Sequence, residues 1–337
     1  MSRFLARRLA AAALLLLGIT LVTFLLTNVV PGDPAAANLG QRAIEDPEAV
    51  ASFNRRYGLD KPLPVQYVTY LGNLIQGDLG SSQQSRRPVR EDLAEFAPAT
   101  LELAGTAIAI SMVIGVALGT LAAFRRDRPA DWVLRVVSLG GVSIPVFWLS
   151  LTALYGLTFR WRVFPGSGRL APGAVKPDRV TGMYTVDALL DGDLATFRDA
   201  VMRLLLPALV LAAYAIGLIT RFTRSAVLEV LGNDYVRAAY AKGLPVRTIV
   251  TRHVLRAALV PIITVIGVTF AGLLAGTVLV EKIFNWPGIG MYAYLSATSL
   301  DLPAIIGVSL FVAGVYITLN LLVDVLYGVI DPRVRET

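Results

Sequence analysis

Side chains suited to metal or redox chemistry are nearly absent from this sequence. It has no cysteine and one histidine. Without cysteine, disulfides, thiolate catalysis and cysteine metal sites are excluded. A single histidine argues against a histidine-based metal centre. We therefore predict that the chain holds no metal and no cofactor.

Familiar catalytic motifs are absent as well. The sequence has no G-x-x-x-x-G-K-S/T pattern, so it does not bind ATP through a P-loop. It also has no H-E-x-x-H and no G-x-S-x-G. The apolar stretches contain Ser111, Ser143 and Ser150 but no His, Lys or Asp that would activate them. We predict no catalytic residues, and hence a chain that is not an enzyme.

Charged residues are scarce, and most of the excess positive charge lies beside the apolar stretches. The charged residues make up 16% of the chain, against about 25% in a soluble domain, while 55% of the residues are hydrophobic. This composition indicates an integral membrane protein. The net charge of +7 does not indicate a nucleic-acid partner, because most of the excess lies beside apolar stretches, where membrane orientation requires it.

Six apolar stretches predict an all-α protein with six transmembrane helices. The first, Leu9–Gly32, is uncharged and longer than the 7–15 residues of a signal-peptide core, so we do not expect cleavage. The predicted organisation is an N-terminus with the first span in residues 1–32, an extracytoplasmic region in 33–95, and a core in 96–337. Within the core we predict spans at 96–124, 136–159, 204–220, 257–280 and 302–323, outer loops at 160–203 and 281–301, a cytoplasmic loop at 221–256, and a cytoplasmic tail.

The arginines fix the predicted orientation. Those before the first span, those at 125–128, those between the fourth and fifth spans and those of the tail fall on one side if the spans alternate. Because Lys and Arg accumulate on the cytoplasmic side, both termini are predicted to be cytoplasmic.

Small residues and one proline mark places where helices meet or bend. Gly115 and Gly119 in the second span, and Gly272 and Gly276 in the fifth, have the four-residue spacing that lets helices approach closely. In the third span, Ser143 and Pro145 predict a kink. These residues are candidates for a transport pathway or for helix packing, and the pattern does not choose between the two.

The longest polar segment closely bounded by spans is the basic stretch Asn233–Pro261. Asn233 or Asp234 suits a helix N-cap, followed by a helix over Tyr235–Lys242. Gly243 suits the left-handed position after that helix, and Pro245 prevents its continuation. A second helix is then expected from Val246 toward Pro261. We expect Ala238 and Ala239 to form a small, smooth face that fits a cleft in a partner. Alternatively, the segment only fixes topology and contacts anionic membrane lipid.

This basic segment resembles the EAA loop of ABC-importer permeases, which contacts the ATPase. Arg237-Ala238-Ala239 is followed by three residues and Gly243, with Arg237 in the place of the usual glutamate. That departure, and the long interval to Pro261, resemble the dipeptide/oligopeptide branch of the family. Arg252-His253 and Leu255-Arg256-Ala257 also match that branch, except that Ala257 stands where asparagine is common.

The resemblance extends over nearly the whole chain, and it is closest to the first of the two permeases of such importers. The other stretches that carry it are Pro31–Pro34, Tyr57–Pro62, Gly77–Gly80, Pro98–Leu103, Ser143–Trp148, Glu281–Phe284, Pro287–Gly290 and Asp331–Arg333. The outer loop 160–203 departs from the pattern, because it is longer than is usual in the family.

The resemblance implies a type I ABC importer permease fold and a set of partners. These are a second homologous permease that completes the pathway, two cytoplasmic ATPase subunits that hydrolyse ATP, and an extracytoplasmic solute-binding protein. It also implies a bacterial inner membrane and a di- or oligopeptide substrate, although relatives handle nickel chelates, glutathione and opines. The implied ATPase-coupling residues are Asp234, Tyr235, Arg237, Ala238, Ala239, Lys242, Gly243 and Leu244.

Other classes of function predict different behaviour. An ion-coupled peptide transporter usually carries ionisable residues along its path, whereas Glu102 and Asp324 lie near the ends of their spans. A membrane enzyme would turn over as a single chain, and a channel or scaffold would not depend on ATP hydrolysis.

Overall fold

The computed structural model describes residues 2–29, 46–57 and 61–330. Within these ranges it is almost entirely helical, and its only bridge is the isolated antiparallel pair of Ser81 and Pro88. The stretches Pro31–Pro34 and Asp331–Arg333 lie outside the described residues, as does the Gly58–Asp60 part of Tyr57–Pro62. The chain divides into two compact units. Unit 1 is Met1–Pro98 with Gly288–Thr318, and unit 2 is Ala99–Pro287 with Leu319–Thr337.

Four helices in the described part of the chain are long and apolar enough to cross a membrane. These are α6 (Val89–Phe124), α10 (Leu194–Leu231), the continuous run Val246–Leu274 and α15 (Leu302–Ile330). The run comprises α12 (Val246–Thr248), the π-helical η2 (Ile249–Val254) and most of α13 (Leu255–Ile283). The first predicted span corresponds to α1 (Ser2–Val29), whose apolar part is the shorter Ala10–Leu25. Six spans therefore remain a prediction.

The third predicted span is broken rather than gently kinked. Helix α7 (Pro129–Ser143) meets α8 (Val146–Ala153) and its π-helical continuation η1 (Leu154–Arg160) at a bend of 98°. Ile144, between them, has an extended backbone with ψ of 123°. The residue before a proline is pushed out of the helical region, and Pro145 lacks an N–H to continue the helix. If the bent pair counts as one span, the candidate spans in the described part number five.

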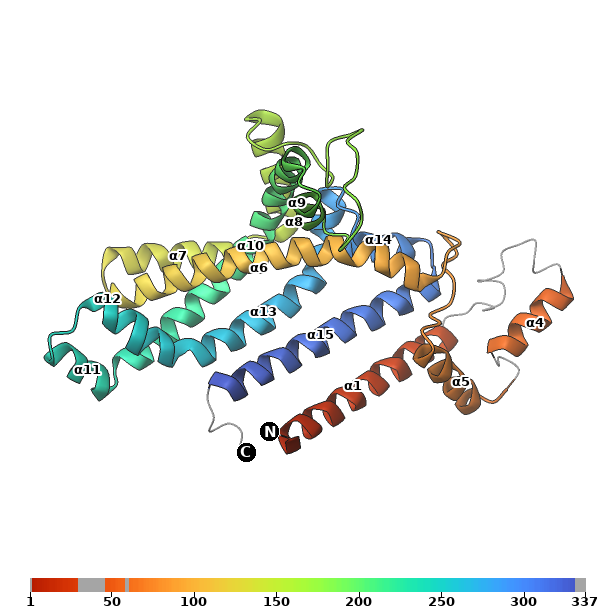
Figure 1. Cartoon of the computed structure of the whole chain (residues 1–337), viewed down its shortest axis with the longest axis horizontal. Helices are drawn as coiled ribbons and strands as arrows, with labels where there is room; N and C mark the ends of the chain where they lie inside the picture. The colour runs from red at the N-terminus through yellow and green to blue at the C-terminus, as the bar shows by residue number, and fades with distance from the viewer. Residues whose placement is uncertain (1, 30–45, 58–60, 331–337) are drawn as a thin grey trace. The chain divides into compact units, whose positions relative to one another are not determined.

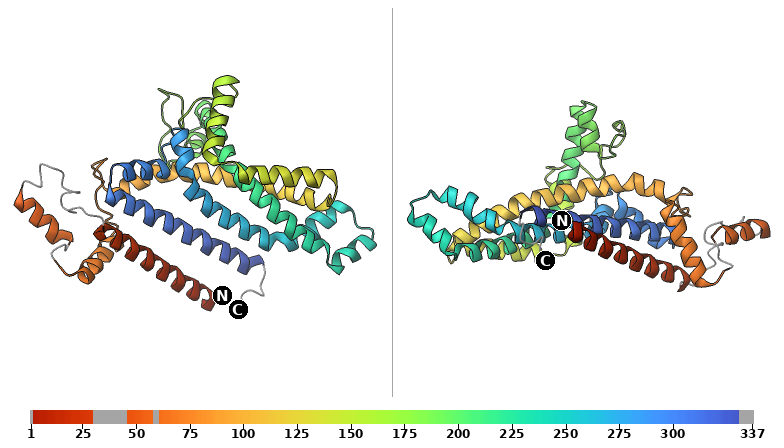
Figure 2. Two further views of the ribbon diagram at one scale, coloured as in Figure 1. Left: turned by 180° about the vertical axis from the view of Figure 1, so that it is seen from behind. Right: turned by 60° about the horizontal axis from the view of Figure 1, so that its bottom comes forward.

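Helix α10 is the central element of unit 2. It packs against α7, α8 and α13, and Figures 1 and 2 show α13 beside it. A Cβ on Gly115 would lie 2.8 Å from Ile219, and one on Gly119 would lie 2.6 Å from the Thr220 carbonyl oxygen. The glycine row of α6 is thus where α6 and α10 approach closely. Gly272 and Gly276 differ, because a Cβ on either would meet no described atom within 4 Å.

A buried ion pair holds the segment 160–203 against α6 within unit 2. The Arg169 guanidinium donates to Glu102 at 2.7 Å and to the Gly182 carbonyl at 2.9 Å, and it lies 3.6 Å from the centre of the Tyr184 ring. Glu102 also accepts from the amide and the hydroxyl of Thr185, the second residue of α9 (Tyr184–Leu190). The segment is therefore a fixed part of the fold of unit 2.

Asp187 of α9 closes the turn before this helix. Burial opposes its ionisation, yet hydrogen bonds from the Thr181 hydroxyl and from the Thr181 and Gly182 amides hold the pKa of the carboxyl below its ordinary value. A buried carboxylate that accepts several such bonds stays charged. The turn that presents Gly182 to Arg169 is thereby stabilised.

Unit 1 joins the N-terminal helices to a short helical pair. Tyr67 of α5 (Leu63–Ile75) lies 2.9 Å from the Thr20 hydroxyl of α1, while α4 (Pro47–Tyr57) contacts α5. Helix α14 (Ile289–Thr298) precedes α15, and the buried Asp301 between them accepts from the Ser82 hydroxyl at 2.6 Å. These contacts tie the segment before α6 to the segment before α15.

Candidate functional site

The basic segment folds as a helix–turn–helix at one end of unit 2. Helix α11 (Asp234–Ala241) follows the end of α10 (Figure 1). Asn233 occupies its N-cap with an extended backbone, and its carbonyl accepts from the amides of Val236 and Arg237 at 3.1 and 3.3 Å. The Asn233 side chain makes no capping hydrogen bond. The predicted cap position is therefore right, but the backbone alone provides the cap.

The end of α11 is a complete Schellman motif. The Gly243 amide donates to the Tyr240 carbonyl at 2.9 Å, and the Leu244 amide donates to the Ala239 carbonyl at 3.3 Å. This is the paired arrangement that ends helices on a left-handed residue. Gly243 has φ of +70°, as the sequence predicts. Leu244 packs on the cluster that buries Ala239, which supplies the apolar contact typical of the motif.

Two residues anchor α11 to the rest of unit 2. Val236 and Ala239 are 1% and 5% exposed, and they lie in one apolar cluster with Val227 of α10, Ile249 of η2 and Ala258 of α13. Their spacing of three places both on one face of the helix. The short helix is thus coupled by packing to two membrane helices.

The prediction of a joint Ala238–Ala239 face is wrong. Neighbouring residues on an α-helix are turned by about 100° from each other, and here Ala239 faces the core while Ala238 is exposed. The outward face instead places Ala238 between Tyr235 and Lys242, all of them exposed. A small residue between larger ones leaves a shallow depression on the helix.

The charges around α11 are open to solvent or to a partner. Arg237 lies 3.5 Å from Asp234, but their side chains are 73% and 96% exposed. Such a pair contributes little to stability, so Arg237 stays available for a partner. Arg247 and Arg252, on the following helical run, are exposed as well. The surface around α11 is therefore basic.

The second helix of the segment contains a π-helical turn that the sequence did not predict. It begins after Pro245, as expected, and runs through η2 into α13 with Pro261 inside. π-Turns are uncommon and are frequent at functional sites. Ile249 and Val254, at its two ends, are fully buried. No feature of the amino-acid sequence of residues 249–254 indicates a π-helical turn rather than an ordinary α-helix.

The candidate pathway residues lie apart from this loop. Ser143 and Pro145 are exposed at the break between α7 and α8, next to the exposed Phe147 and Trp148. The structure thus does not bring them together with the residues of α11.

Long apolar helices with a basic, helical loop between two of them are typical of an integral membrane protein. Residues 115–336 match the family model described as binding-protein-dependent transport system inner membrane component. Residues 1–104 match the model of the N-terminal part of such membrane components. The chain belongs to this family of binding-protein-dependent transport permeases.

Characterised relatives align with the chain from end to end. It is 43% identical over 339 residues to the di/tripeptide transport system permease protein DppB of Pseudomonas aeruginosa (strain UCBPP-PA14), covering 100% of this chain and 99% of the relative. It is 40% identical over 338 residues to the dipeptide transport system permease protein DppB of Escherichia coli (strain K12), covering 100% and 99%.

A solved structure supports the fold. The MetNI methionine ABC transporter in an inward-facing conformation aligns with a TM-score of 0.51 at 15% identity, covering 69% of this chain and 93% of the other. At that identity the likeness shows the fold alone. It confirms the predicted type I ABC importer permease fold.

Proposed function

We propose that this chain is the first permease subunit of an ATP-driven importer of di- or oligopeptides. It forms half of the pathway with a second homologous permease, two cytoplasmic ATPase subunits supply the energy, and an extracytoplasmic binding protein delivers the solute. The names of the aligned relatives, which are permeases for dipeptides and for di- and tripeptides, support this substrate class.

The two faces of α11 support this function most directly. Its buried face joins the cluster of α10, η2 and α13, while its outward face is basic around Ala238. A partner that seats on the outward face and moves will therefore displace a body that is packed on membrane helices. The Schellman motif fixes the end of α11, so the last turn of the helix resists deformation when a partner moves it.

The mechanism is a switch between outward-facing and inward-facing states. ATP binding draws the ATPase subunits together, and α11 follows the surface on which it is seated. Because α10 and α13 share the apolar cluster of α11, their cytoplasmic ends move with it. ATP then shifts the equilibrium only by its different affinity for the two states.

The location follows from the charge pattern. We place both termini and the α11 loop in the cytoplasm, because arginines gather beside the corresponding ends of the spans. Residues 33–95, 160–203 and 281–301 then lie outside the cell membrane of a bacterium, where the binding protein docks. Solute choice rests mainly with that protein.

Two of the buried carboxylates, Glu102 and Asp131, are each paired with an arginine. Glu102 is paired with Arg169 at 2.7 Å, and Asp131 is held by Arg224 at 2.7 and 2.8 Å. Carboxylates neutralised in this way are poor carriers of a transported proton.

A reconstitution experiment tests the proposed function. The assembled complex in proteoliposomes, with binding protein outside and ATP inside, is expected to accumulate a labelled dipeptide. The same complex with a catalytically inactive ATPase should not accumulate it, even under an imposed proton gradient. Uptake that follows the proton gradient and survives loss of ATP hydrolysis would contradict the importer assignment.

A further inference from the structure

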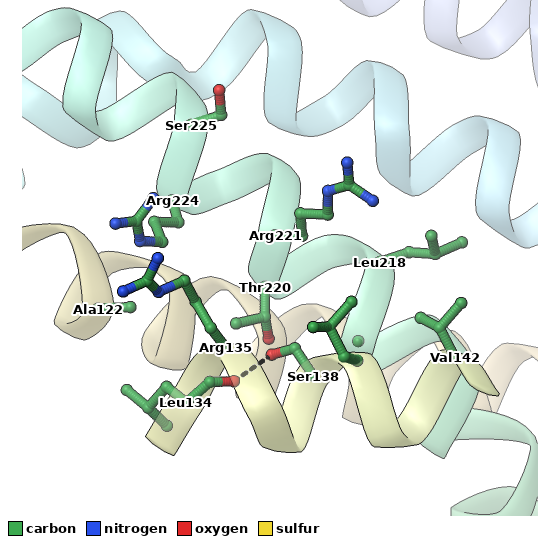
Figure 3. Close-up of a pocket in the computed structure, with 12 residues that line it drawn as sticks. Ala122, Leu134, Arg135, Ser138, Val142, Leu218, Thr220, Arg221, Arg224 and Ser225 are labelled. Carbon is green, nitrogen blue, oxygen red and sulfur yellow. Dashed lines mark hydrogen bonds between the residues drawn. The ribbon is translucent and has the colours of Figure 1, made fainter. Parts of the chain in front are cut away.

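A pocket of about 300 Å³ lies between α7 and α10 in unit 2. Its walls are apolar along Leu134, Leu139 and Val142 of α7 and Leu218 of α10. Figure 3 shows Arg135 and Arg224 directed toward the same end of this pocket, with Arg221 one turn away on α10. One site thus combines an apolar wall with three arginines.

The arginines carry more positive charge than the nearby carboxylate neutralises. Arg224 makes two hydrogen bonds to the fully buried Asp131, one to each carboxylate oxygen, at 2.7 and 2.8 Å. The Asp127 amide donates to Asp131 as well, at 3.1 Å. Arg135 reaches Asp131 only at 3.6 Å, beyond hydrogen-bond distance, and its side chain is 48% exposed. One carboxylate thus faces two guanidinium groups, at 2.7 Å for Arg224 and 3.6 Å for Arg135, and a net positive charge remains at this end of the pocket.

A further polar group of the pocket has no hydrogen-bond partner among the described residues. Arg221 also lines the pocket, but Figure 3 shows its guanidinium directed away from Arg135 and Arg224. Thr220 is 2% exposed, and its buried hydroxyl has no hydrogen-bond partner in the described structure. Figure 3 shows this hydroxyl turned toward Ser138 of the opposite wall. A buried hydroxyl without a partner is costly unless a ligand or water meets it.

The apolar wall indicates which kind of anion fits. Leu134, Leu139 and Val142 of α7 and Leu218 of α10 form this wall, which runs along the two helices away from the paired arginines. A free phosphate or a peptide carboxylate would leave this wall uncovered, whereas an acyl chain would cover it. Basic pockets between membrane helices on the cytoplasmic side suit anionic lipid headgroups.

The geometry points to a binding site for one anionic phospholipid between α7 and α10. The Arg135 guanidinium holds the phosphate, and an acyl chain lies along Leu139 and Val142. This inference rests on the proposed membrane orientation, which places the pocket at the cytoplasmic surface. It does not depend on the ATPase or on the transported solute.

Native mass spectrometry of the purified full chain, titrated with phosphatidylglycerol, tests the site. One phosphatidylglycerol should be retained in preference to phosphatidylcholine. Arg135→Gln should weaken that binding about fivefold, the effect expected for one arginine near a charged membrane surface. Arg135→Lys keeps the charge and should retain most of the affinity. Arg128→Gln removes an exposed arginine that does not line the pocket, and it should change the affinity less than about twofold, because an exposed charge outside the pocket acts only through screened attraction.

Several results would overturn the inference. One is an equal loss of affinity in Arg128→Gln and Arg135→Gln, which would show only general attraction to the basic surface. Another is displacement of the lipid by millimolar inorganic phosphate or by dipeptide, which would make this a site for a soluble anion. Exclusion of the lipid once the second permease is bound would make the groove a subunit interface. Arg135→Gln with unchanged lipid binding and unchanged thermal unfolding would contradict it directly.

Discussion

Gly243 provides the sharpest test of how α11 is held. Its φ of +70° lies in the left-handed region, and a Cβ added there would meet no atom within 4 Å. The cost of a substitution is therefore backbone strain, with no steric clash to complicate it. For Gly243→Ala that strain is roughly 1–2 kcal/mol, which corresponds to a factor of about 5–30 in an equilibrium between formed and unformed turn.

The loss of ATPase binding should therefore depend on how well the side chain at position 243 tolerates the left-handed backbone. Asn tolerates the left-handed conformation better than Ala does, and the β-branched Val fits it worst. Binding of the purified ATPase to the permease in nanodiscs, and ATP-driven uptake, should both fall in the order Gly, Asn, Ala, Val. Membrane insertion should be unchanged in all four. If Gly243→Asn and Gly243→Val bind the ATPase equally well, the left-handed turn does not position the coupling helix.

Three other substitutions test the packing described above. Val236→Ala removes two buried methyl groups from under α11, costs about 1.6 kcal/mol, and should weaken ATPase binding in the same titration. Arg169→Met leaves Glu102 buried without its arginine partner and costs about 3–5 kcal/mol of stability. It should therefore speed proteolysis within 160–203. The double variant with Glu102→Leu should recover most of the lost stability. Gly119→Val meets the α10 backbone and should cost about 1–3 kcal/mol in thermal unfolding, whereas Gly276→Ala should have almost no effect.

Local chemistry made much of the α11 segment predictable. The positions of Gly243 and Pro245 determine where α11 ends and where the next helix begins, because turns depend on a few adjacent residues. The glycine spacing was less informative, because Gly115 and Gly119 lie against α10 whereas the equally spaced Gly272 and Gly276 meet no described atom within 4 Å. Predicting the turn at Gly243 needs no knowledge of distant parts of the chain.

Features that depend on distant residues were missed. Which alanine of the Ala238–Ala239 pair faces inward depends on where α10 and α13 lie, and the local sequence does not contain that information. The pairing of Glu102 with Arg169 joins residues 67 positions apart. The 98° break at Pro145 was predicted only as a kink, because proline indicates that a helix changes direction but not by how much.

The absence of cysteine makes the central claim directly measurable. The single substitution Ala238→Cys places a thiol on the outward face of α11, and Ala195→Cys places one on an exposed position near the start of α10. Maleimide labelling of each variant is followed in nanodiscs with and without the ATPase subunits. We predict that the ATPase protects the thiol of the Ala238→Cys variant and leaves the thiol of the Ala195→Cys variant reactive. Equal labelling of the Ala238→Cys variant in the free and the ATPase-bound permease would contradict the assignment of α11 as the coupling helix.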